Sequence, residues 1–152
     1  QQNFVYKKNV FRDIELSPYK TSIEKFYQLN IIKGTQISLF EPTRMITRAE
    51  FLKIILLSHC YTYNTQDTEH LFYSDVEVSS WQAKVISKAQ ELNIFVPNET
   101  LFSDSNFRPN DIITKSEAVK ILIRMAMIEI QNIGDSKYKD IDEDQYKKYI
   151  HI

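Results

Sequence analysis

The histidines and the cysteine are the residues here that most often bind metal ions or act as nucleophiles, but their spacing does not suit either chemistry. His59 and Cys60 are adjacent, so they would lie on different faces of a helix. His70 and His151 do not combine with Cys60 or with carboxylates in the helical spacing of a zinc-like site. A lone thiol at the end of an apolar run is more typical of a buried small residue. We therefore expect no metal site and no cysteine nucleophile.

The acidic residues also lack a recognisable catalytic or metal-binding pattern. Asp140, Asp142 and Asp144 alternate as in a calcium-binding loop, but the glycine and the distal glutamate of that loop are absent. A solvated acidic turn is the simpler interpretation. The sequence also contains no glycine-rich phosphate loop, no nucleophile elbow and no paired carboxylates in an apolar setting. We expect neither catalysis nor a cofactor.

Composition and charge narrow the class further. The chain has 152 residues, 43% of them hydrophobic, and a formal net charge of -1, so it lacks the positive field that attracts nucleic acid. Its longest uninterrupted apolar runs, such as residues 54–57, cover only four residues, far short of a membrane span. Without an initiator methionine or a signal segment, the sequence suggests a mature secreted product or a piece of a longer protein.

An aromatic-x-Asp-aliphatic motif occurs three times and is the main signal in the sequence. Its aspartates are Asp13, Asp75 and Asp140, which lie 62 and then 65 residues apart, and each is followed six positions later by an aromatic residue. The first two units continue in step through Phe-x-Pro turns at 40–42 and 107–109, whereas the third unit stops before that turn. The pattern predicts two complete repeats and the front half of a third.

Each complete unit is predicted to fold as helix, loop, helix. Apolar residues recur at helical spacing from Tyr19 and from Trp81 onward, which places the first helices there. The second helices are predicted to begin at two capping boxes, in which a Thr hydroxyl and a Glu carboxylate satisfy backbone donors. These capping residues are Thr47 with Glu50 and Thr114 with Glu117. The predicted apolar faces are Phe51, Leu52, Ile55 and Leu56 in one helix and Val119, Leu122, Met125 and Ala126 in the other.

The repeated aspartates and the aromatic residues that follow them are each interpreted as structural residues of the first helices. The carboxylates of Asp13, Asp75 and Asp140 are interpreted as caps of the helix that follows each of them. The aromatic residues that follow them are interpreted as core-packing residues, because packing is the commoner use of an aromatic at the start of an apolar helical face. These aromatic residues are Tyr19, Trp81 and Tyr146.

Taken together, the motifs resemble the S-layer homology domain family. They are the aromatic-x-Asp start, the aromatic-led first helix, the Phe-x-Pro turn and the Ile-Thr-Arg-Ala-Glu string at 46–50. The resemblance implies an all-α fold, with tandem helix-loop-helix repeats in a pseudo-three-fold helical bundle. It divides the chain into a lead-in segment at 1–10, repeats at 11–71 and 72–136, and a partial repeat at 137–152.

The resemblance also implies a function. Such domains are non-enzymatic modules on the outside of the bacterial cell, in the wall or surface layer, where they bind acidic, pyruvylated cell-wall polysaccharide or modified peptidoglycan. Their principal ligand contact is the basic residue of the Thr-x-x-Glu motif, which corresponds to Arg48 and Lys115 here. Gly34, Tyr19 and Trp81 are placed near the same grooves. An arginine fork at a helix N-terminus can bind a carboxylate through two hydrogen bonds, whereas lysine is a flexible point charge.

A structural alternative stays open beside glycan binding. In it the module has kept the fold, has lost glycan binding and contacts protein partners, through self-association or through a neighbouring chain that completes the third repeat. The position of Arg48 discriminates between the two. A ligand residue would face an open groove, whereas a structural one would be tied to a neighbouring carboxylate.

Overall fold

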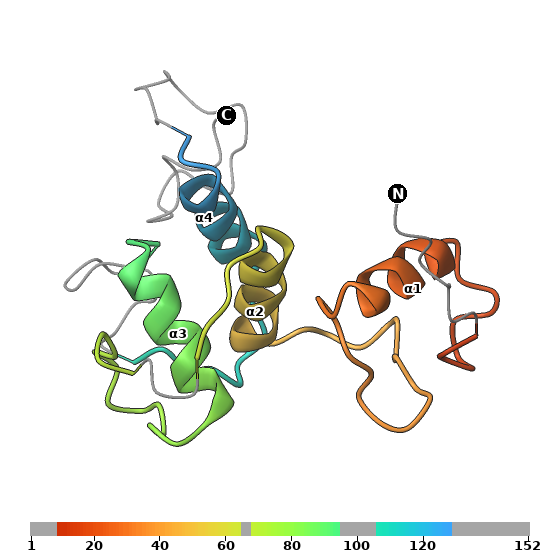
Figure 1. Cartoon of the computed structure of the whole chain (residues 1–152), viewed down its shortest axis with the longest axis horizontal. Coiled ribbons are helices and arrows are strands. Elements are labelled where there is room, and N and C mark those ends of the chain that lie inside the picture. The colour runs from red at the N-terminus through yellow and green to blue at the C-terminus, as the bar shows by residue number, and fades with distance from the viewer. Residues whose placement is uncertain (1–8, 65–67, 95–105, 129–152) are drawn as a thin grey trace. The chain divides into compact units, whose positions relative to one another are not determined.

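Four helices form the regular structure in the computed structural model, which describes residues 9–64, 68–94 and 106–128. They are α1 (Lys20–Gln28), α2 (Arg48–Ser58), α3 (Trp81–Glu91) and α4 (Lys115–Met125) (Figure 1). Within these three ranges there is no strand, and the only ladder-like pairs are two isolated bridges, Gln36 with Leu39 and Thr47 with Ile112. The predicted all-α class is confirmed.

The chain divides into two compact units, Gln1–Met45 and Ile46–Ile152. The first holds α1, and the second holds α2, α3 and α4. The boundary falls just before the second helix of the first sequence repeat. The helices of that repeat therefore belong to different compact units, and the repeat boundaries at 71 and 136 remain predictions.

Side-chain caps define where α2, α3 and α4 begin. Thr47 accepts a hydrogen bond from the amide of Glu50, and the Glu50 carboxylate accepts one from the amide of Thr47. Thr114 and Glu117 form the same reciprocal pair at the start of α4, so both predicted capping boxes are present. Ser80 caps α3 through the amide of Ala83. These bonds satisfy first-turn donors that have no partner within the helix.

The larger unit is built around a core where α2 packs against both α3 and α4. Its fully buried side chains include Leu52 and Leu56 from α2, Ile86 from α3 and Ile121 from α4. The predicted apolar face of α4 was partly wrong, because Leu122 is exposed whereas Ile121 is buried. The apolar stripe of a helix is broad, and which of its edges becomes buried depends on the helices that pack against it.

The smaller unit has its own core of Phe11, Ile14 and Ile23, with Tyr27 and Phe40 packed against it. The Phe11 ring meets Tyr27 edge-on at 5.1 Å and Phe40 at 5.5 Å between centroids. These aromatic contacts join α1 to the segments on either side of it, so burial of Phe11 organises the unit.

Backbone conformation reproduces the repeat independently of side-chain packing. Six of the eight left-handed residues in the described ranges, all but Asn9 and Ser38, occur in equivalent pairs, where the chain reverses after a helix or within the Phe-x-Pro turn. The pairs are Asn30 (φ 56°) with Asn93 (φ 56°), Glu41 (φ 59°) with Arg108 (φ 52°), and Cys60 (φ 61°) with Met127 (φ 53°). The two predicted repeats therefore share their turns as well as their helices.

Two kinds of feature are absent from the described ranges. None of their helices is long and apolar enough to cross a membrane. No group of three or more His, Cys, Asp or Glu side chains in those ranges could hold a metal ion. Several residues that the sequence brought into consideration lie outside the described residues: Asp140, Asp142, Asp144, Tyr146 and His151.

Candidate functional site

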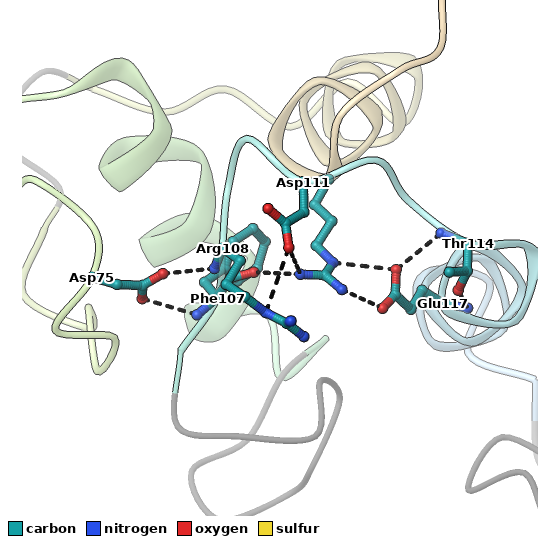
Figure 2. Close-up of polar contacts among 7 residues, drawn as sticks. Asp75, Phe107, Arg108, Asp111, Thr114 and Glu117 are labelled. Carbon is teal, nitrogen blue, oxygen red and sulfur yellow. Dashed lines mark hydrogen bonds and ion pairs between the residues drawn. The ribbon is translucent and has the colours of Figure 1, made fainter.

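Arg48, the first residue of α2, is buried against the start of α4. Its guanidinium donates two hydrogen bonds to the Glu117 carboxylate, from Nη2 to Oε1 at 2.6 Å and from Nε to Oε2 at 3.2 Å (Figure 2). The exposed fractions are only 5% for Arg48 and 4% for Glu117. This is a bidentate ion pair in a desolvated setting, and it neutralises the arginine.

The remaining donor edge of Arg48 is also occupied. Nη1 donates to the carbonyl oxygen of Phe107 at 3.3 Å and approaches Oδ2 of the exposed Asp111 at 3.5 Å (Figure 2). Of the two alternatives posed by the sequence, Arg48 has the position expected of a structural residue. Direct ligand contact by Arg48 stays a prediction.

Backbone hydrogen bonds join the same two segments. The amide of Arg48 donates to Asp111 at 2.9 Å, the amide of Ala49 donates to Pro109 at 3.1 Å, and the amide of Ile113 donates to Ile46 at 3.2 Å. First-turn donors of α2 therefore find carbonyl acceptors in the turn that precedes α4. The two capping motifs are therefore joined by backbone hydrogen bonds, and the Arg48–Glu117 ion pair adds a side-chain contact between them.

The repeated aspartates hold the Phe-x-Pro turns. Asp75 accepts hydrogen bonds from the amides of Phe107 at 2.9 Å and Arg108 at 2.7 Å (Figure 2). Asp13 accepts equivalent bonds from the amides of Phe40 at 3.0 Å and Glu41 at 2.7 Å. The interpretation of both as helix caps was wrong, because their partners lie about thirty residues downstream, where left-handed Glu41 and Arg108 turn adjacent amides toward one carboxylate.

These hydrogen bonds also affect the acidity of Asp13. Desolvation raises the pKa of Asp13, but the bonds from the amides of Phe40 and Glu41 outweigh it and hold the pKa below its ordinary value of 3.8. The ionised form is therefore the one that stabilises the turn.

The two first-helix aromatics are not core residues. Tyr19 is 69% exposed and Trp81 is 40% exposed, so the core-packing interpretation was wrong for both. Tyr19 is the N-cap residue before α1 and Trp81 is the first residue of α3, whereas the buried side chains of α1 and α3 begin later, at Ile23 and Ala83. Their accessible rings could therefore contact a ligand.

The other two predicted ligand residues have contrasting surroundings. Lys115, the first residue of α4, is exposed. Gly34 is enclosed, because a side-chain carbon there would collide with the carbonyl oxygen of Leu39 and the ring of Phe11. Gly34 therefore allows Phe11 to pack closely within the smaller unit, whereas Lys115 presents a cation to solvent.

Lys53 is a candidate functional residue that sequence reasoning missed. Its ammonium lies 5.0 Å from the centroid of the Trp81 ring. The signal available in the sequence was its recurrence, since Lys53 and Lys120 hold equivalent positions after the two Thr-x-x-Glu motifs. Lys120 is buried, so only Lys53 of this pair is partly accessible.

The larger unit presents accessible groups that are suited to binding. Trp81 offers an aromatic surface, and Lys53 and Lys115 offer ammonium donors. The buried carboxylate, Glu117, is paired with Arg48 rather than held ready for proton transfer.

Known proteins are similar in sequence to most of this chain. The S-layer homology domain matches residues 10–52 and 72–119. The chain is 31% identical over 141 residues to the exoglucanase XynX of Acetivibrio thermocellus, a match covering 90% of this chain and 12% of that protein. It is also 31% identical to the amylopullulanase of Thermoanaerobacterium thermosulfurigenes, covering 90% and 7% respectively.

A surface-layer protein is similar too. The 125 kDa surface-layer protein of Lysinibacillus sphaericus is 28% identical over 125 residues, which is 80% of this chain and 10% of that protein. The chain thus spans about a tenth of the length of each of these relatives. The matched segments include both aspartate turns, both capping boxes and the Arg48–Glu117 pair. On these grounds the chain belongs to the S-layer homology domain family.

Proposed function

We propose that this chain is a non-covalent anchoring module that binds an acidic polymer of the bacterial cell wall on the outside of the cell. The polymer would be a carboxylate-bearing polysaccharide, pyruvylated for example, or modified peptidoglycan. One observation carries the proposal: most of this chain resembles a segment of an exoglucanase, of an amylopullulanase and of a surface-layer protein. Proteins with such different names share no single reaction, but all could use attachment to the cell surface.

The described residues support a binding surface on the larger unit. Trp81 and Lys115 are accessible there, as a ligand contact requires, whereas Arg48 is buried. In this proposal Arg48 acts indirectly, by holding the starts of α2 and α4 together. Lys115, at the positive end of the α4 dipole, is the cation placed to meet a carboxylate.

A pull-down on purified cell-wall sacculi tests the proposal, with sacculi used before and after chemical removal of the attached polysaccharide. We expect retention of the unaltered chain on intact sacculi, and weaker retention of Lys115→Ala and Trp81→Ala. Lys88→Ala is the matched control, because it removes the same charge from α3 at a lysine already paired with Glu91 at 2.7 Å. Equal retention with and without polysaccharide, or none at all, would contradict glycan anchoring.

A second candidate is an assembly module that contacts protein partners. The observation favouring it is the Arg48–Glu117 ion pair, which gives the motif's arginine a structural partner. Light scattering after size-exclusion chromatography tests this alternative across a concentration series. A mass that rises with concentration, combined with no sacculus binding, would favour assembly over anchoring.

A further inference from the structure

We infer that Lys53 and Trp81 together form a subsite for a carboxylate-bearing sugar, in which Lys53 supplies the cation that discriminates acidic from neutral polymers. The inference rests on the proposed anchoring function and adds a residue to it. It starts from one contact, the Lys53 ammonium lying 5.0 Å from the centroid of the Trp81 ring.

The two residues are held by packed helices. Lys53 lies in α2 and Trp81 begins α3, and these helices pack together through fully buried Leu52, Leu56, Ala83 and Ile86. Groups carried on rigid, packed helices keep their geometry better than groups on loops. The cation and the ring are therefore presented as a preformed pair.

The pair is partly accessible. Trp81 keeps 40% of its surface exposed, although Ala83, Val85 and Ile86, which follow it in α3, are fully buried. Lys53 is half-buried. An aromatic ring beside an ammonium is suited to an anionic ligand that also has an apolar face.

Each component of the pair recognises a different part of such a sugar. The C–H face of a pyranose can lie against the indole, and a carboxylate substituent can accept a hydrogen bond from the ammonium of Lys53. An ammonium has three N–H donors, so contact with the ring is compatible with further partners. A neutral sugar could use only the ring, and the lysine would then add nothing to its affinity.

The test uses the intrinsic fluorescence of Trp81, which is the chain's single tryptophan and is part of this subsite. The probe is wall polysaccharide released from sacculi of Lysinibacillus sphaericus, in three forms. One is native, one is treated with mild acid to remove ketal-linked pyruvate, and one has all its carboxyl groups reduced to alcohols. The protein variants are Lys53→Met, Lys53→Arg and, as the matched control, Lys88→Met.

We expect a saturable fluorescence change with the native polymer and about tenfold weaker binding of the carboxyl-reduced form, the loss of one charge-assisted hydrogen bond. Lys53→Met should lose most of the preference for the native form and keep only the part that Lys115 supplies, while Lys53→Arg and Lys88→Met should resemble the unaltered chain. Affinity lost with mild acid identifies the carboxylate as a pyruvate ketal, and affinity lost only on carboxyl reduction identifies it as a uronate.

Two results would overturn the inference while leaving anchoring intact. One is a chain that binds sacculi without any fluorescence change at Trp81. The other is a Lys53→Met variant that still prefers the native polymer as strongly as the unaltered chain does. If the unaltered chain fails to bind sacculi, the proposed function fails and this inference fails with it.

Discussion

Replacing Arg48 with methionine should destabilise the larger unit because it leaves Glu117 buried without its counter-ion. The two side chains are each 6% exposed and are joined by an ion pair of 2.6 Å, so little water can compensate for the loss. Removing one partner of a buried pair typically costs about 3–5 kcal/mol. Glu117 would keep its capping bond to the amide of Thr114, which places the expected loss near the lower end, at about 3 kcal/mol.

The measurement is urea unfolding followed by Trp81 fluorescence, since Trp81 lies in the larger unit and reports on it directly. The double variant Arg48→Met/Glu117→Gln should recover most of the loss, because it removes the buried charge and keeps an oxygen for the cap. Arg108→Met is the matched control. It makes the same substitution in the same unit, at an arginine whose ion pair with Asp111 is longer, 3.7 Å, and whose side chain is more exposed, and it should cost less than about 1 kcal/mol.

An Arg48→Met variant no less stable than Arg108→Met would refute the buried-pair reasoning, and so would a double variant no more stable than the single one. Binding of Arg48→Met to sacculi, measured well below its unfolding midpoint, separates the two roles of the residue. If Arg48 is structural, the folded variant should still bind. If it contacts the ligand, as the family resemblance implies, binding should fall even when the protein is folded.

Two further predictions concern the smaller unit. Asp13→Asn should lower the protection of the Phe40 and Glu41 amides from hydrogen exchange at neutral pH. Because the pKa of Asp13 is lowered in the folded state, its contribution is present above the ordinary value of 3.8 and is lost as the pH falls through the lowered pKa. The difference between the variant and the unaltered chain should therefore shrink in acid, and a difference independent of pH would contradict this. Gly34→Ala should destabilise the unit by about 1–3 kcal/mol in thermal unfolding followed by circular dichroism, because the added methyl collides with Phe11 and the Leu39 carbonyl, and an unchanged midpoint would show that the site can relax.

Local features of this chain could be predicted from its sequence. Both capping boxes are present because each depends only on residues three positions apart. The repeats were likewise visible as repeated motifs. The all-α class followed because apolar residues recur at helical spacing and nothing alternates as in a strand.

Features that depend on distant residues could not be predicted. Asp75 lies 32 residues before Phe107, its partner in the turn, and Arg48 lies 69 residues before Glu117. A motif in one repeat gives no sign that its basic residue will pair with the acidic residue of the next. The exposure of Trp81 was missed for a related reason. The apolar pattern of a helix does not show at which residue burial begins.

The ion pair between the two repeats also bears on how such chains can be duplicated or excised. A cut between residues 71 and 72 would place Arg48 in one fragment and Glu117 in the other. Each fragment would then keep a charged side chain that is buried and paired in the intact chain but has lost its partner. The segment that folds around this pair begins at Ile46, in the middle of the first sequence repeat. The compact unit therefore begins about half a repeat later than the predicted sequence repeat. A change at the basic position of one motif then calls for a matching change at the acidic position of the next motif.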